Sequence, residues 1–292
     1  MSLRINQNID AFNSYRNLSV TQGQMSKSLE KLSSGFRINR AADDAAGLAI
    51  SEGLRAQTGG LKVAARNAQD GISVVQTAEG ALTETHSILQ RMRDLAVQAS
   101  NDGALTNDDK VKADKEFQAL AKEIQDIADK TSFNGTKLLD GSYNAKAFQV
   151  GANTGDTLAV SIGNMGITTS AVDPDGAGPL TDQPGLFGAA ASAGDITTAA
   201  NAQTALTAID TAIGKVSDER ATLGATQNRL EHKINNLNVT VENLSASESR
   251  IRDTDMAQEM MNFTRSQILS QAGTAMLAQA NQAPQGVLSL LR

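Results

Sequence analysis

The side chains in this sequence that could bind a metal or carry out acid–base chemistry are not grouped into a recognisable site. The two histidines, His86 and His232, are far apart, and neither belongs to a His-Glu-x-x-His pair, which argues against a zinc protease. The chain has no cysteine, so disulfides, thiolate metal sites and cysteine nucleophiles are excluded. We expect each histidine to be solvated or to lie at the edge of a helix seam.

Two loop-like segments resemble binding loops but lack essential positions. Residues 151–156 read Gly-Ala-Asn-Thr-Gly-Asp and lack the Gly-Lys-Ser/Thr of a phosphate loop, which favours a β-turn. Residues 173–176 read Asp-Pro-Asp-Gly, without the further acidic position and closing Glu of a calcium loop. The sequence therefore predicts no metal, no cofactor and no enzyme activity.

Composition narrows the function classes further. The 292 residues are 40% hydrophobic but only 3% aromatic, which suits narrow helix–helix seams better than one thick core. A net charge of −6 argues against nucleic-acid binding, and no stretch is apolar over the length needed to cross a membrane. Because no apolar core or small-residue cleavage site follows Met1, no secretory signal peptide is expected. By the ordinary rules this predicts a cytoplasmic protein, but a protein exported by a dedicated machine that needs no signal peptide would have the same sequence features.

In place of a site, the sequence carries two long series of apolar residues with heptad spacing. The first series is Leu54, Leu61, Ala68, Val75, Leu82, Leu89 and Ala96, with Ala65 and Ile72 as companions. The second is Leu223, Leu230, Leu237, Leu244 and Ile251, with Ile234 and Val241. This spacing places the apolar side chains on one stripe of a helix, so the two series predict an antiparallel coiled coil.

The helices that carry these series are bounded by clear sequence signals. We expect helices over 45–99, 107–130 and 197–249, with Asp43 or Asp44 capping the first and Asp195 the last. Two further amphipathic segments, 1–40 and 255–290, are set off by breaks at Ser33-Ser34-Gly35 and around 250–255. Between them, Asn-Gly and Asp-Gly pairs within 133–162 predict a small β-hairpin patch, and the Pro- and Gly-rich segment 163–196 predicts a surface loop.

The predicted fold is therefore mainly α: a long antiparallel helical coiled-coil rod with a small β-hairpin patch, plus a terminal two-helix coiled coil. The terminal segments are polar at many positions, so each alone would be a marginal helix. Such segments tend to order only when a partner offers surface. The alternative is that the two segments simply pair with each other inside one chain.

Several stretches at both ends resemble the bacterial flagellin family, which forms the flagellar filament. The resemblance covers residues 1–165 and 197–292. It is carried by Ile-Asn-Gln-Asn at 5–8, Leu-Ser-Ser-Gly-Phe-Arg-Ile-Asn at 32–39, Ala-Ala-Asp-Asp-Ala-Ala-Gly-Leu-Ala-Ile at 41–50, Arg-Asn-Ala-Gln-Asp-Gly-Ile-Ser at 66–73, Leu-Gly-Ala-Thr-Gln-Asn-Arg-Leu at 223–230 and Ala-Gln-Ala-Asn-Gln at 278–282.

The resemblance implies a domain organisation and a location. Residues 1–44 and 253–292 would form a terminal coiled-coil domain at the inner filament core, with its helices folding on polymerisation. Residues 45–162 and 197–252 would form the helical rod domain, and the loop 163–196 would replace the outer domains, giving a short form of flagellin. The family also implies export through the flagellar type III apparatus to the extracellular flagellum, without a cleavable signal peptide.

The resemblance further implies partners and contact residues. Other copies of the chain would be the main partner, joined by an export chaperone, the filament cap and hook–filament junction proteins. The expected polymerisation core is Ile5, Ile9, Leu18, Met25, Leu29, Leu32, Ile268, Met276, Leu277, Leu288 and Leu291. Arg91, Leu95 and Glu116 match positions through which a vertebrate Toll-like receptor recognises the family.

Two other functions remain open on the sequence alone. A hook–filament junction protein shares the terminal pattern but assembles as a short ring. A secreted protein whose main role is receptor engagement would rely on Arg91, Leu95 and Glu116 rather than on polymerisation. No nucleic acid or membrane partner is expected in any of these cases.

Overall fold

The computed structural model describes residues 7–103, 106–167, 186–187 and 196–290, with side chains described as far as residue 282. The chain divides into two compact units. The terminal unit comprises Met1–Thr58 and Glu242–Arg292, and the central unit comprises Gly59–Val241. Within the described residues the structure has five helices and two antiparallel two-stranded sheets, which confirms the predicted mainly helical fold.

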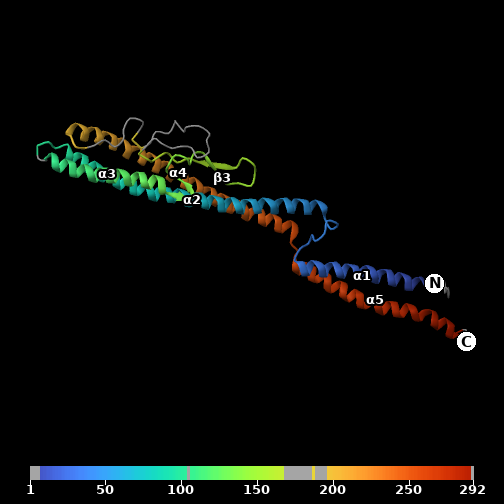
Figure 1. The fold of residues 1–292 in the computed structure, drawn as a ribbon. Coiled ribbons are helices and arrows are strands. Elements are labelled where there is room, and N and C mark those ends of the chain that lie inside the picture. Colours follow the sequence, from blue (N-terminus) through green and yellow to red (C-terminus); the bar gives the residue numbers. More distant parts are fainter. Residues whose placement is uncertain (1–6, 104–105, 168–185, 188–195, 291–292) are drawn as a thin grey trace. The chain divides into compact units, whose positions relative to one another are not determined.

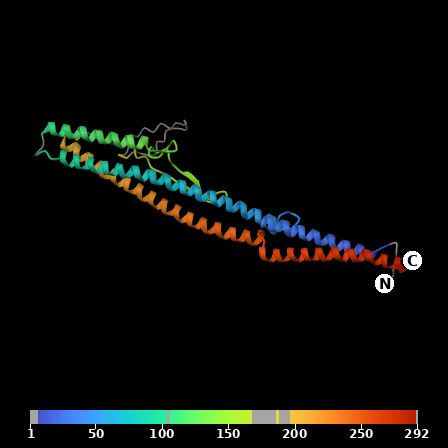
Figure 2. The ribbon, with the colours of Figure 1, turned by 90° about the horizontal axis from the view of Figure 1, so that it is seen from below.

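Three helices build the central unit. They are α2 (Ala45–Ala99), α3 (Asn107–Lys130) and α4 (Ala199–Arg252), and the parts of them inside this unit lie side by side (Figures 1 and 2). Arg93 Nε donates to Asp210 Oδ1 at 2.7 Å, whereas Arg220 Nη2 lies 3.7 Å from Glu79 Oε1. The earlier α2 residue, Glu79, lies by the later α4 residue, Arg220, and the later α2 residue, Arg93, by the earlier α4 residue, Asp210. The two helices therefore run antiparallel.

The predicted heptad positions form the core of the central unit. On α2 they include Ala68, Val75, Leu82, Leu89 and Ala96, and on α4 they include Leu223, Leu230 and Leu237, all at most 3% exposed. From α3, Phe117 and Ile124 are fully buried in the same core. Burying a side chain of this size stabilises the fold by about 1.5–3 kcal/mol relative to leaving it in water.

The β patch consists of two short hairpins rather than one. Strands β1 (Ser132–Phe133) and β2 (Thr136–Lys137) are joined by Asn134 and Gly135, whose φ angles of 49° and 79° are those of a type I′ turn. Strands β3 (Lys146–Gln149) and β4 (Thr157–Val160) pair antiparallel in a second hairpin. Most of the predicted loop 163–196 lies outside the described residues.

The ends of the helices follow side-chain caps. Asp44 Oδ1 accepts the Gly47 N–H at 2.8 Å, which selects Asp44 over Asp43 as the cap of α2. At the start of α4, Thr198 Oγ1 accepts the Asn201 N–H at 3.2 Å. Thr198 therefore serves as the cap, and Asp195, which the sequence suggested, lies outside the described residues.

One carboxylate of the central unit, that of Glu219, is partly removed from water. Glu219, on α4, is half-buried, and its Oε1 accepts the backbone N–H of Gly163 at 3.2 Å. Burial raises the pKa of Glu219 above its ordinary value, while the hydrogen bond from Gly163 opposes this shift. The charged form is therefore destabilised in the folded chain relative to the unfolded chain.

Replacing this charge should stabilise the central unit at neutral pH. A Glu219→Gln variant keeps an oxygen that accepts the Gly163 N–H but removes the buried charge, so we expect a gain in the free energy of unfolding of about 0.5 kcal/mol. Because the folded-state pKa is raised, the wild-type chain recovers this stability as the pH falls toward the ordinary value of a carboxyl. Urea unfolding of both proteins across the acidic range measures the difference.

The matched control is Glu84→Gln, at an exposed position of α2. That substitution should leave the stability difference close to zero at every pH. A Glu219→Gln variant that is less stable than the wild type at neutral pH would contradict the prediction.

Candidate assembly surface

The terminal unit is built on one antiparallel pair of helices. These are α1 (Ile9–Ser34) and α5 (Met256–Leu290), which lie side by side along their lengths (Figures 1 and 2). At one end of the pair, Asn8 Nδ2 donates to the carbonyl oxygen of Ala280 at 2.7 Å. At the other end, Phe36 forms a β-bridge with Asp253. These contacts fix the antiparallel direction.

The seam between α1 and α5 follows a heptad pattern, but small and polar residues occupy much of it. On α1 the buried or half-buried heptad positions are Ala11, Ser14, Leu18, Thr21, Met25, Ser28 and Leu32, and on α5 they include Phe263, Ser266, Ser270, Gly273, Leu277 and Ala280. Leu18 packs directly on Gly273, where an added Cβ would lie 3.2 Å from its Cδ1. Small residues let the two backbones approach closely, so the seam buries little apolar volume.

Most of the large apolar side chains of the pair lie outside this seam. We call them the outward apolar residues, and each is 48–73% exposed. They are Ile9, Phe12, Tyr15, Val20 and Leu29 on α1, and Met256, Met260, Met261, Ile268, Leu269 and Met276 on α5. Soluble monomers rarely expose so much apolar surface unless it contacts a partner.

The structure divides the predicted polymerisation core between the two surfaces. The seam positions are Leu18, Met25, Leu32 and Leu277, and the outward positions are Ile9, Leu29, Ile268 and Met276. Ile5, Leu291 and the side chain of Leu288 lie outside the described residues. The predicted set omitted seven of the outward apolar residues: Phe12, Tyr15, Val20, Met256, Met260, Met261 and Leu269. Their common signal is a large apolar side chain away from the heptad positions.

The outward side of α5 is hollowed. A groove of about 490 Å³ is lined by Met260, Met261, Thr264, Arg265, Ile268 and Leu269. These residues form two rows along the helix, with members of each row four residues apart, which is the spacing of neighbouring turns. Such a groove between rows of side chains is the shape that receives a ridge of side chains from another helix.

The chain leaves α1 through a tightly defined turn. Gly35 has a φ of 76°, in the left-handed region, and its N–H donates to the carbonyl oxygen of Lys31 at 2.8 Å. This is the C-cap geometry that glycine permits most readily. The helix therefore ends here, as the Ser33-Ser34-Gly35 break predicted.

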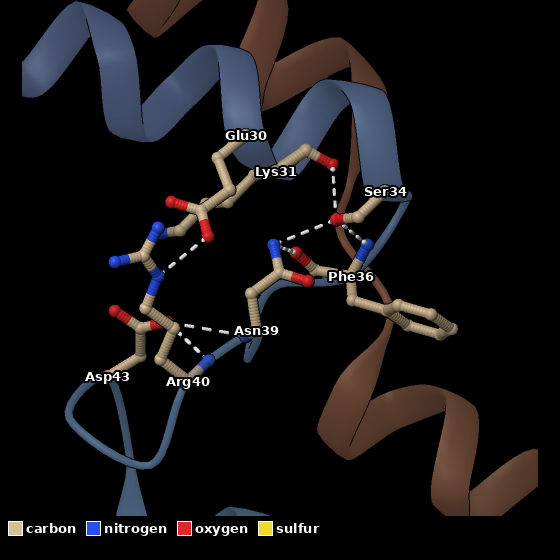
Figure 3. Close-up of polar contacts among 7 residues, drawn as sticks. All are labelled: Glu30, Lys31, Ser34, Phe36, Asn39, Arg40 and Asp43. Carbon is tan, nitrogen blue, oxygen red and sulfur yellow. Dashed lines mark hydrogen bonds and ion pairs between the residues drawn. The ribbon is translucent and has the colours of Figure 1, made fainter.

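A polar network then holds the connection to α2 (Figure 3). The Asp43 carboxylate accepts the backbone N–H groups of Arg40 and Asn39 at 3.0 and 3.3 Å, and the hydrogen bond from Arg40 lowers the pKa of Asp43. Asn39 Nδ2 donates to Ser34 Oγ at 2.8 Å, and Arg40 Nε pairs with Glu30 Oε1 at 2.8 Å. The connection is thus tied back to the last turns of α1.

Arg252 joins this connection to the end of α4. Its guanidinium lies 4.9 Å from the centre of the Phe36 ring, and its Nη1 donates to Glu52 Oε1 at 2.6 Å. Backbone bonds reinforce the join: Arg37 N donates to the Arg252 oxygen at 2.7 Å, and Thr254 N donates to the Gly35 oxygen at 2.9 Å. The segment that follows α1 and the junction between α4 and α5 are therefore hydrogen-bonded to each other.

The predicted receptor-contact residues lie in the central unit and do not form a single exposed cluster. Arg91 and Glu116 form an ion pair between α2 and α3, with Nη2 to Oε1 at 2.6 Å, and both side chains are about half exposed. Leu95 is only 3% exposed and packs in the core. A partner at this surface would therefore meet Arg91 and Glu116, while Leu95 supports the helix beneath them.

Nothing in the described part of the chain resembles a catalytic or metal centre. It has no group of three or more histidine, aspartate or glutamate side chains placed to hold a metal ion. His232 is exposed on α4, and His86 is half-buried on α2, where it lies 3.0 Å from Gln90 Nε2. None of the described helices combines the length and the apolar character needed to cross a membrane.

Comparison with known protein families matches both ends of the chain. Residues 5–144 match the bacterial flagellin N-terminal helical region, and residues 206–291 match the bacterial flagellin C-terminal helical region. Each of the two units contains residues from both matched regions. The unmatched residues between them include the Pro- and Gly-rich loop.

Full-length relatives agree with this assignment, and one solved structure shares the fold. The chain is 54% identical to a flagellin of Halalkalibacterium halodurans, with 99% of each chain covered, and 50% identical to a flagellin of Bacillus subtilis, with 99% of this chain and 100% of that one covered. A putative flagellar hook-associated protein from Vibrio parahaemolyticus shares the fold at 15% identity, with a TM-score of 0.55 over 72% of this chain and 100% of that chain. High identity over nearly the whole chain favours a filament subunit over a junction protein. The chain belongs to the bacterial flagellin family, the structural and non-enzymatic proteins of the extracellular flagellar filament.

Proposed function

We propose that the outward apolar residues of α1 and α5 are the surface through which copies of this chain polymerise into the filament. The observation that supports this is the difference in residue type between the seam and the outward surface of the α1–α5 pair. Small and polar residues occupy much of the seam inside one chain, whereas Phe12, Ile268 and the other outward apolar residues remain in water. A neighbouring copy offers a matching apolar surface because it carries the same residues.

The energetics favour ordering the terminal segments on assembly. Removing apolar surface from water contributes about 25 cal/mol per Å², so each outward leucine or isoleucine adds about 1.5–3 kcal/mol once buried. Fixing a residue's backbone costs about 1–2 kcal/mol, and a lone pair of helices with a small-residue seam recovers little of that cost. The contacts that offset the ordering cost are therefore those with other copies, and the terminal helices fold on polymerisation.

This mechanism assigns a role to each part of the chain. Residues 1–44 and 253–292 form the inner filament core, and residues 45–162 and 197–252 form the rod domain around it. The loop 163–196 stands in place of the outer domains. The contact-based boundary of the terminal unit falls at Thr58 and Glu242, so the first turns of α2 and the last turns of α4 accompany the core segments.

The same exposed apolar residues account for the further partners that we propose. A subunit with this surface open to water needs a chaperone over its C-terminal segment until it is exported through the flagellar type III apparatus. At the filament ends, the cap and the hook–filament junction proteins would cover the surface that the next copy otherwise covers.

A receptor contact at Arg91 and Glu116 is a second, separate proposal. Both side chains are about half exposed and are held in one geometry by their ion pair, so they present a fixed charged feature on the surface of the central unit. A Toll-like receptor would meet this feature on a free subunit. Leu95 would contribute by holding α2 in place from the core.

Charged substitutions at outward apolar positions should prevent polymerisation without unfolding the central unit. In Phe12→Asp or Ile268→Asp, a carboxylate would have to be buried without a partner, so the critical concentration for polymerisation should rise roughly a hundredfold or more. Sedimentation of filaments measures this concentration, and circular dichroism follows the helices of the central unit. Phe12→Leu and Ile268→Leu are the matched controls and should polymerise. Normal filaments from either aspartate variant would refute the assignment of this surface.

Removing part of one helix of the terminal pair should abolish filaments altogether. Deletion of residues 1–20 or of residues 275–292 takes away part of the outward apolar set and leaves the partner helix with an open seam. We expect no filaments by electron microscopy and a central unit that still unfolds cooperatively. Truncated chains that form filaments as long as those of the full chain would show that the terminal pair is not the assembly core.

The receptor proposal has its own test on depolymerised protein. Arg91→Ala and Glu116→Ala should each lower the response of a Toll-like receptor reporter cell by roughly tenfold, because the charged pair is removed from the contact. Arg93→Ala, which breaks the neighbouring pair with Asp210, is the matched control and should leave the response unchanged. Leu95→Ala should act differently, by destabilising the core by about 2–5 kcal/mol. If Arg91→Ala and Glu116→Ala gave the same response as the wild type and Arg93→Ala, this surface would be excluded as the receptor contact.

A further inference from the structure

Six methionines of this chain fall into two groups with very different exposure. The sequence has eight, and four of them lie on α5. Met256, Met260, Met261 and Met276 are 48%, 50%, 59% and 57% exposed, whereas Met92 and Met165 in the central unit are 0% and 6% exposed. All four exposed methionines belong to the outward apolar residues.

We propose that these four α5 methionines are an oxidation site at which a hydroperoxide switches off the assembly of a free subunit. The inference rests on the proposed function, because it takes the outward apolar residues as the polymerisation surface. It goes beyond that function by assigning a chemical modification to the surface. Methionine oxidation follows the exposure of the sulfur, so the α5 group should react before the central group.

The reaction needs only the peroxide and the thioether. A sulfur lone pair attacks one oxygen of hydrogen peroxide, an S–O bond forms, and the O–O bond breaks. The sulfur loses two electrons, and the peroxide is reduced to water after a proton moves to the departing oxygen. Each event converts one methionine and one peroxide into one sulfoxide and one water.

The position of the sulfurs explains why the product would block assembly. Met260 and Met261 line the groove on α5 together with Ile268 and Leu269, so an added S=O dipole would lie inside an otherwise largely apolar contact. Among the residues that line the groove, Thr264 and Arg265 carry hydrogen-bond donors. A sulfoxide oxygen that a neighbouring copy encloses out of reach of these two side chains is an unsatisfied buried dipole, which opposes association.

The switch would act on the free subunit and not on the filament. In the filament the outward apolar residues are covered by neighbouring copies, so the sulfurs lose the exposure on which the reaction depends. A terminal segment that orders only on assembly exposes the same sulfurs before assembly as well. Oxidation would therefore stop growth and leave existing filaments intact, and a methionine sulfoxide reductase would restore the subunit.

Treating depolymerised full-length protein with hydrogen peroxide tests the site directly. Peptide mass mapping over time should show sulfoxide at Met256, Met260, Met261 and Met276 at least several-fold faster than at Met92 and Met165. At the stage when the α5 group is oxidised, the critical concentration for polymerisation should be at least roughly tenfold higher. Methionine sulfoxide reductase should return it to the untreated value. The same peroxide dose given to assembled filaments should leave α5 largely unmodified.

A variant separates the sulfur chemistry from other oxidative damage. The combined substitution Met256→Leu, Met260→Leu, Met261→Leu and Met276→Leu keeps apolar side chains of similar volume, so it should polymerise both with and without peroxide. If this variant fails to polymerise even untreated, the reductase experiment on the oxidised wild-type chain still shows whether methionine oxidation blocks assembly, because it requires no substitution.

The outcomes distinguish this inference from the proposed function. Polymerisation of fully α5-oxidised protein at its normal critical concentration would overturn the inference, as would oxidation of Met92 and Met165 at the same rate as the α5 group. In either case the proposed function stands as long as Phe12→Asp and Ile268→Asp block filaments. If those aspartate variants polymerise normally, the proposed function fails first.

Discussion

Two helices that pack only on each other can bury no more than the strip along which they touch. This geometric limit applies to α1 and α5, which lie side by side along their lengths in the terminal unit (Figures 1 and 2). Serine, glycine and alanine occupy much of that strip, which brings the backbones close, and most of the bulky side chains are left on the remaining surface. The exposed apolar set is therefore a direct result of how the seam is filled.

The central unit shows what changes when a third helix and two hairpins are added. There α2 is covered by both α3 and α4, so leucines at heptad positions are fully buried, and Phe117 and Met92 find space in the same core. The only carboxylate with a clearly raised pKa in the described residues, Glu219, lies at the edge of this core, where the chain departs toward the loop.

Sequence periodicity predicted much of this arrangement. The heptads identified Leu82, Leu89 and Leu223 as core, and the glycine at position 35 identified the end of the first helix. Periodicity did not predict the exposed apolar residues that lie outside the heptad repeat. Phe12 and Met261 lie off the heptad, so the spacing did not mark them. Leu95 was matched to a receptor contact by the family resemblance and not by periodicity, and its side chain is only 3% exposed. The hairpins were predicted as one patch, since dipeptide turn signals locate a turn but do not say which strands share a sheet.

The small-residue seam has a consequence for how this chain can change during evolution. Serine, alanine and glycine form few interlocking contacts, so the seam itself holds the two helices in register only weakly. The register is set at the ends, where Asn8 meets Ala280 and where Arg252 meets Phe36. Substitutions between these anchors should be tolerated more readily than insertions or deletions. An α-helix has 3.6 residues per turn, so the loss of one residue rotates every later side chain of that helix by about 100° relative to the earlier ones, and the outward residues on either side of the deletion no longer share one face. The length of each terminal helix should therefore be more strongly constrained than its composition.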